Sequence, residues 1–204
     1  MLFRSGNGYI STVSVEGKIL EQQWVRGLNA PKGLALYQGR LYTADIDTLV
    51  VIDIASATIE ARYPVADAVF LNDVTASPDG DIFVSDMMTD RIHRLHKGRF
   101  ETWLESAHLE APNGLTIQGD YLYVGAWGVL EEGFDTKTPG HLKMVSLGDK
   151  SIHSVGPGTP LGNLDGLAPD RDGDFYVSDW MAGKVYHLDR NGAAKELLAL
   201  EQGS

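Results

Sequence analysis

The 204-residue sequence contains no cysteine, which excludes disulfide bonds, thiolate metal sites and a cysteine nucleophile. It also has few basic residues: 17 lysines and arginines stand against 28 acidic residues, for a formal net charge of −11. Nucleic acid and anionic membranes are therefore not expected as partners, whereas a metal ion or a cationic or neutral small molecule is. No Gly-x-Ser-x-Gly motif occurs, so a serine hydrolase built on that motif is not expected either.

The residues after Met1 have neither the apolar run nor the cleavage site of a signal peptide, and any targeting segment would lie upstream of them. Chains without cysteine suit both the cytoplasm and the periplasm. The sequence therefore leaves the cellular compartment unassigned.

Helical periodicity is absent as well, and β-branched and aromatic residues gather instead in short runs. Four such runs share one form: Leu41–Asp45, Ile82–Asp86, Leu122–Ala126 and Phe175–Asp179. A similar phrase precedes each of them by about ten residues: Pro31–Leu34, Leu71–Val74, Pro112–Leu115 and Leu164–Leu167. Between the two, each unit has a turn pair tolerant of positive φ: Gln38-Gly39, Asp79-Gly80, Gly119-Asp120 and Asp172-Gly173. Each unit is therefore predicted to open with a β-hairpin.

The second position of each phrase is polar, and these four residues are called the polar column below: Lys32, Asn72, Asn113 and Asp165. Their spacings are 40, 41 and 52 residues. A period near forty residues with several short strands per unit is typical of a β-propeller, so we predict an all-β propeller fold.

The repeat divides residues 1–204 into a single propeller domain of about four and a half blades. The predicted units are a half blade and four blades, at residues 5–29, 30–70, 71–111, 112–163 and 164–204. Because propellers close with roughly four to eight blades, we expect a fragment truncated at both ends, with self-association through open sheet edges. Closure by a partner chain and a closed ring of fewer blades are the alternatives.

In a propeller the first strand of each blade lines the central channel, so Asn72, Asn113 and Asp165 should point toward one another. Two amide oxygens and a carboxylate are hard ligands that suit Ca²⁺. One carboxylate is little charge for a dication, and the column offers no second one, since Lys32 has the wrong sign. Turn chemistry alone explains Asn113-Gly114 and Asp165-Gly166, but Asn72 has no glycine after it and so favours a shared site.

Asn72 in Leu-Asn-Asp-Val, Asn113 in Pro-Asn-Gly-Leu and Asp165 in Leu-Asp-Gly-Leu resemble the family of senescence marker protein (regucalcin), gluconolactonase and luciferin-regenerating enzyme. The resemblance implies a six-bladed propeller with Ca²⁺, or another divalent ion such as Zn²⁺ or Mg²⁺, in the channel. By this resemblance Asn72, Asn113 and Asp165 match three metal ligands, and a fourth ligand, a first-blade Glu, would lie outside this sequence.

The same resemblance implies hydrolysis of a lactone or ester, with Asp165 as base or nucleophile. Gluconolactonase-type members have an arginine two residues before the first Asn, where this chain has Phe70, which favours a more apolar substrate than a sugar lactone. Asp86 and Asp179 end second strands and are interpreted as structural repeats, with a role in supporting the metal ligands as the alternative.

The longest spacing in the column comes from an insertion at Gly128–Gly140. It is interpreted either as a lid that brings Phe134 over the channel, with Trp127 at its base, or as a plain surface hairpin. Lys32, Phe70, Trp127 and Phe134 are thus the candidate substrate-binding residues. The alternative function is a non-catalytic propeller that binds a small ligand or protein on its channel face.

Overall fold

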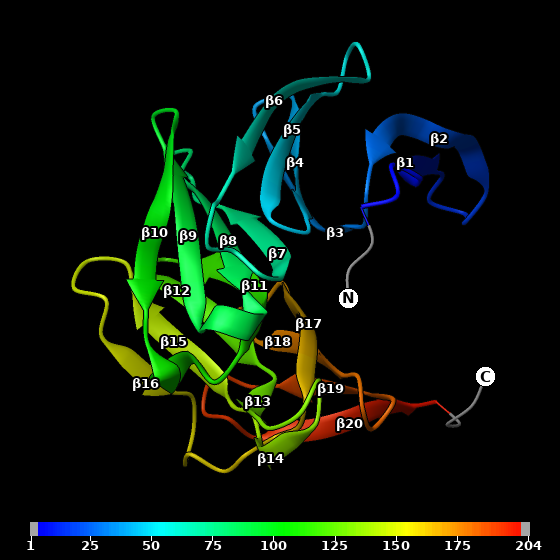
Figure 1. Cartoon of the computed structure of the whole chain (residues 1–204). Coiled ribbons are helices and arrows are strands. Elements are labelled where there is room, and N and C mark those ends of the chain that lie inside the picture. Colours follow the sequence, from blue (N-terminus) through cyan, green and yellow to red (C-terminus); the bar gives the residue numbers. More distant parts are fainter. Residues whose placement is uncertain (1–3, 201–204) are drawn as a thin grey trace.

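The computed structural model, which describes residues 4–200, consists of short antiparallel β-strands and two 3-10 helices (Figure 1). The all-β prediction is therefore confirmed. No helix in the described part of the chain is long and apolar enough to cross a membrane.

Most strands belong to four antiparallel sheets of four strands each, in which neighbours in the sequence pair with one another. The first two sheets are β3 (Pro31–Tyr37), β4 (Arg40–Asp45), β5 (Thr48–Asp53) and β6 (Thr58–Pro64), then β7 (Leu71–Ala76), β8 (Ile82–Asp86), β9 (Arg91–His96) and β10 (Arg99–Glu105). The other two are β11 (Pro112–Gln118), β12 (Tyr121–Ala126), β15 (Leu142–Ser146) and β16 (Ile152–Ser154), then β17 (Leu164–Pro169), β18 (Phe175–Asp179), β19 (Lys184–Leu188) and β20 (Ala194–Ala199). Each sheet opens with the hairpin expected from the turn pairs.

The remaining strands form two hairpins, β1 (Gly8–Val13) with β2 (Ile19–Leu28) and β13 (Gly128–Leu130) with β14 (Thr136–Pro139). The β1–β2 hairpin packs through Val25 and Leu28 against the first four-stranded sheet. The β13–β14 hairpin is inserted between β12 and β15. Of the two 3-10 helices, η1 (Met87–Thr89) lies between β8 and β9 and η2 (Ala107–Leu109) lies between β10 and β11.

The first strands of the four sheets lie side by side in the order β3, β7, β11 and β17, and the sheets extend outward from them (Figure 1). Apolar side chains fill the space between successive sheets. Between the second and third sheets Phe83 packs edge-on against Trp103, with ring centroids 5.1 Å apart. Between the third and fourth, Tyr123 and Phe175 have centroids 4.7 Å apart. Each large apolar side chain buried in this way contributes about 1.5–3 kcal/mol.

The aspartates that end the second strands of the sheets bind the backbone just before the first strands. Asp86 Oδ1 accepts a hydrogen bond from the backbone N–H of Phe70 at 2.8 Å, and Asp45 Oδ1 accepts one from Ala30 at 2.7 Å. Asp179 Oδ1 accepts a longer one from Asn163 at 3.3 Å. In the third sheet Ala126 takes the place of the aspartate, and Asp90 accepts from the backbone N–H of Ala111 instead. These repeated carboxylates hold each column residue at the same place in its sheet.

Candidate functional site

Each first strand contains a bulge at the polar column. The pairing register shifts between the first and fourth residues of all four phrases: Pro31/Leu34, Leu71/Val74, Pro112/Leu115 and Leu164/Leu167. A bulge inserts an extra residue, so the strict alternation of side chains between the two faces is lost there. The residues inside the bulge are the column residue and the one that follows it.

In two of these bulges, a backbone N–H group donates a hydrogen bond to a serine side chain on the neighbouring strand. The N–H of Asp73 donates to Ser85 Oγ at 2.9 Å, and the N–H of Gly166 donates to Ser178 Oγ at 2.7 Å. Ser85 Oγ in turn donates to the carbonyl oxygen of Asn113 at 2.8 Å, which links the second sheet to the third. The Val-Ser-Asp phrase that ends β8 and β18 therefore stabilises the bulges beside it.

All four column residues line one pocket of about 600 Å³. Its lining comes from the inner ends of the four sheets and from the β13–β14 hairpin, and comprises Lys32, Gly33, Phe70, Asn72, Asp73, Met87, Asn113, Trp127, Phe134, Asp165, Gly166, Trp180 and Met181. The structure thus brings together the seven residues that the sequence assigned to metal, substrate or catalysis.

Two of the three metal-ligand candidates, Asn113 and Asp165, contact each other directly. The Asn113 Nδ2 amide donates to Asp165 Oδ1 at 2.9 Å, and the Asn72 Nδ2 amide lies 3.9 Å from the Met87 sulfur. Both asparagines make these contacts through the amide nitrogen, so the amide oxygen is the atom with which each could bind a cation.

A dication calls for a further carboxylate, which the polar column does not offer, and Asp73, the residue after Asn72, places one in the pocket. Strict alternation would turn Asp73 away from Asn72, but the bulge in β7 lets both residues line the pocket. Asp73 Oδ2 accepts a hydrogen bond from the N–H of Leu115 at 2.7 Å. The pKa of Asp73 is raised to about 6, chiefly by burial and to a smaller extent by the charge of Asp165, while backbone hydrogen bonds oppose the rise.

Asp73 and Asp165 place two carboxylates in one pocket, and a bound cation would balance their negative charge. The donors available in the pocket are the carboxylates of Asp73 and Asp165 and the amide oxygens of Asn72 and Asn113. This all-oxygen set fits Ca²⁺ or Mg²⁺ better than a metal that prefers sulfur or nitrogen ligands.

Glycine follows the column residue in the other three bulges, and at Gly33 and Gly114 the next inner strand approaches closely. A Cβ added to Gly114 would lie 2.3 Å from the carbonyl oxygen of Asp165 and 2.9 Å from the nitrogen of Leu167. Both are backbone atoms, which cannot rotate away. Gly114 therefore allows β11 and β17 to pack together.

Replacing Gly114 by alanine is expected to lower the free energy of unfolding by about 2 kcal/mol, because the added methyl group overpacks this contact. Urea unfolding measures the loss. Gly148→Ala is the matched control, since its added Cβ would meet only Ser146 Oγ, at 3.8 Å, and should change stability by less than about 0.5 kcal/mol. Equal stabilities of the two variants would contradict this account of the β11–β17 contact.

Aromatic side chains form the wall of the pocket on the side of the β13–β14 hairpin. The ring of Phe134, in the loop between these strands, packs edge-on against Phe70 and Trp127, with centroid distances of 5.7 and 6.0 Å. The Trp127 Nε1–H donates to the carbonyl oxygen of Phe134 at 2.9 Å, which anchors the loop. The hairpin therefore closes one side of the pocket.

Asp86 and Asp179, the candidates for supporting the metal ligands, accept hydrogen bonds from backbone N–H groups. No hydrogen bond joins either of them to Asn72, Asn113 or Asp165 within residues 4–200. Asp86 instead holds the backbone of Phe70, so its influence on the pocket passes through that aromatic ring.

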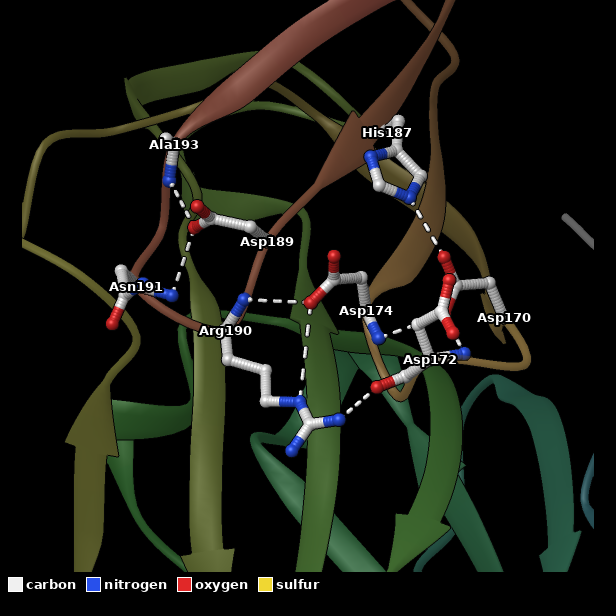
Figure 2. Close-up of polar contacts among 8 residues, drawn as sticks. All are labelled: Asp170, Asp172, Asp174, His187, Asp189, Arg190, Asn191 and Ala193. Atoms are coloured by element: carbon white, nitrogen blue, oxygen red, sulfur yellow. Dashed lines mark hydrogen bonds and ion pairs between the residues drawn. The ribbon is translucent and has the colours of Figure 1, made fainter.

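A second group of potential metal ligands, Asp170, Asp174 and His187, is drawn in Figure 2, and none of the three lines the pocket. Their ligand atoms lie within 4.8 Å of one another. Asp170 already accepts from His187 Nε2 at 2.8 Å and from two backbone N–H groups of its own turn. It stands at the opposite end of the β17–β18 hairpin from the Leu164–Asp179 pair beside the pocket. We interpret this group as a stabilised turn.

Three solved structures illustrate which fold the chain has. A virginiamycin B lyase from Staphylococcus aureus with quinupristin is 16% identical with a TM-score of 0.71, and the match covers 98% of this chain and 65% of the lyase. A nidogen/laminin complex is 18% identical with a TM-score of 0.69, and the match covers 94% of this chain and 71% of that chain. A gluconolactonase from Xanthomonas campestris is 18% identical with a TM-score of 0.63, and the match covers 86% of this chain and 63% of the gluconolactonase. The chain spans 55% to 65% of the length of three such lyase structures. A comparison with curated proteins finds no match.

At these identities the similarities establish the fold alone: the chain is a β-propeller protein, with a pocket where its inner strands meet. More particularly, the chain belongs to the SMP-30/Gluconolactonase/LRE-like family, whose model matches residues 20–201. The resemblance that the three-residue motif indicated is thereby confirmed.

Proposed function

We propose that this chain is a divalent-cation-dependent hydrolase of lactones or esters, with its reaction centre at the polar end of the pocket. The observation that carries the proposal is the convergence of Asn72, Asn113 and Asp165, with Asp73, on one pocket in a member of this family. The cation would be held by these residues, with Ca²⁺ as the first candidate and Mg²⁺ and Zn²⁺ as alternatives. When bound, it would act as a Lewis acid toward the carbonyl oxygen.

Asp165 is the proposed catalytic residue. Its Oδ1 accepts the hydrogen bond from the Asn113 amide, which fixes the orientation of the carboxylate. The other carboxylate oxygen can accept a proton from a water molecule as that water attacks the carbonyl carbon. Attack by the carboxylate itself, through an acyl intermediate, is the alternative that the same geometry supports.

The pocket walls support an apolar substrate. Phe70, Trp127 and Phe134 form a continuous aromatic surface, and Met87 lies against it. Phe70 occupies the position where gluconolactonase-type members have an arginine, so sugar hydroxyls would find no guanidinium there. We infer that aromatic or alkyl lactones and esters fit this pocket better than sugar lactones.

Calcium titration by calorimetry, followed by hydrolysis assays with dihydrocoumarin, phenyl acetate and gluconolactone, tests this function. We expect saturable Ca²⁺ binding, faster hydrolysis of the two aromatic substrates than of gluconolactone, and loss of hydrolysis in EDTA. Asn72→Ala should weaken cation binding at least about tenfold, because it removes one oxygen ligand.

Asn191→Ala, in the turn between β19 and β20, is the matched control and should leave cation binding unchanged. Binding of none of Ca²⁺, Mg²⁺ and Zn²⁺, together with no hydrolysis, would refute the proposal. It would favour the alternative of a non-catalytic propeller that binds a ligand or protein on this face.

A further inference from the structure

Lys32 lies at the opposite end of the line of inner strands from Asp165. The order of these strands is β3, β7, β11 and β17, with Lys32 on the first and Asp165 on the last. Both residues nevertheless line the same pocket. A molecule that reacts beside Asp165 and fills the pocket therefore extends across β11 and β7 toward Lys32.

The Lys32 ammonium is positioned by an aromatic ring rather than by a carboxylate. Its Nζ lies 4.6 Å from the centroid of Phe70, in the range of a cation–π contact, and the residue is half-buried. Within residues 4–200 no acidic side chain, Asp73 and Asp165 included, is within ion-pair distance of it. By contrast, Lys143 and Lys184 each have a glutamate partner.

The charge of Lys32 matters because of where it lies, inside a pocket of a chain whose net charge is −11. Among the described residues that line the pocket, Lys32 is the single cation. The pocket therefore has one ammonium, on β3 at the edge of the row of inner strands, whereas its carboxylates and amides lie on β7, β11 and β17 and its aromatic side chains form one wall.

We propose that the substrate of this pocket carries an anionic group, such as a carboxylate, on an apolar body, and that Lys32 binds this group and determines specificity for it. The inference rests on the proposed hydrolase function for the position of the reacting carbonyl. A substrate whose anion is bound at Lys32 extends across β7 and β11, which places its carbonyl at the Asp165 end, where the proposed cation would lie. The two ends of the pocket thus orient the substrate.

Matched esters test the role of Lys32 in hydrolysis. The probes are the mono-4-nitrophenyl ester of glutaric acid, which ends in a carboxylate, and 4-nitrophenyl pentanoate, which has the same chain length without the charge. Lys32→Met removes the ammonium but keeps an apolar side chain over Phe70. It should lower kcat/KM about tenfold for the charged ester and less than about twofold for the neutral one.

Lys32→Arg should retain kcat/KM for the charged ester within about threefold, since the charge is kept. Lys195→Met, which removes an exposed lysine of β20, is the control and should change neither ester. An unchanged ratio of the two kcat/KM values in Lys32→Met would overturn the proposal.

A binding measurement separates this inference from the hydrolase function. Calorimetric titration of the full chain in EDTA with 3-phenylpropionate and with 3-phenylpropionamide compares an anion with its neutral counterpart. We expect the anion to bind about tenfold more tightly, and Lys32→Met to abolish the difference. If no ester is hydrolysed but this difference appears, the hydrolase proposal fails and the anion site stands. Equal binding of the two compounds by the wild-type chain would refute the anion site.

Discussion

Replacing Asp165 by asparagine is expected to lower kcat/KM for the hydrolysed lactone or ester at least about a hundredfold, while leaving the fold intact. Asparagine has the shape of aspartate and can still accept the hydrogen bond from the Asn113 amide, so the packing of β17 on β11 should survive. It cannot accept a proton from water, and removal of a general base costs about 10²–10⁴ in rate. Steady-state kinetics with dihydrocoumarin, alongside the urea unfolding midpoint, measures both effects.

Glu132→Gln provides the control for this variant, because it removes an exposed acidic residue of the β13–β14 hairpin that does not line the pocket. It should retain full activity. The role assigned to Asp165 would be wrong if Asp165→Asn kept more than a tenth of the wild-type kcat/KM. A variant that lost both activity and its cooperative unfolding would be replaced by Asp165→Glu, which keeps the carboxylate but moves it by one methylene, and which should also be slow.

The repeat predicted the fold well because each repeated unit contains the turn and strand signals of its own hairpin. The turn pairs, the alternating runs and the aspartates that end the second strands all recur with one period, so errors in a single unit are corrected by the others. The pairing of β3 with β4 and of β7 with β8 follows directly from this regularity. The same alignment placed Asn72, Asn113 and Asp165 at equivalent positions, and the structure brings all three to one pocket.

The contribution of Asp73 could not be predicted in the same way, because a bulge breaks the alternation on which the prediction depended. An alternating strand puts Asn72 and Asp73 on opposite faces. The only hint was the absence of a glycine after Asn72, where the other three phrases have one. Glycine there permits the close approach of neighbouring strands, so an aspartate in its place indicates a side chain with a role of its own.

Side-chain contacts between distant parts of the sequence could not be predicted either. Glu110, in the connection before β11, bonds to Lys143 Nζ and to His141 Nδ1, each at 2.6 Å, across more than thirty residues. Neither His141 nor Lys143 is part of the repeated sequence pattern. The backbone carbonyl of Glu110 also accepts from the N–H of Gly128, where the β13–β14 hairpin begins. This group therefore ties the base of the hairpin to the third sheet.

Replacing Glu110 by glutamine is expected to lower the free energy of unfolding at pH 7 by about 3 kcal/mol, because it leaves the buried Lys143 ammonium without a counter-charge. The Lys143 residue is only 5% exposed. Lys143→Met should cost less than about 1 kcal/mol, since it removes the charge and keeps an apolar side chain of similar length. Urea unfolding of both variants and of the double variant measures the coupling between the two residues.

The pH dependence of this loss follows from the pKa of Glu110. Burial raises that pKa, but the hydrogen bonds from Lys143 and His141 outweigh burial and hold it below the usual value of 4.5. A carboxyl whose pKa is lower in the folded state stabilises the protein above its unfolded pKa, and that stabilisation disappears as the pH falls through the folded pKa. The stability difference between wild type and Glu110→Gln should therefore be full at pH 7 and shrink below about pH 4.5. A difference that stayed constant down to pH 3 would mean that Glu110 acts through its shape and neutral hydrogen bonds, and not through its charge.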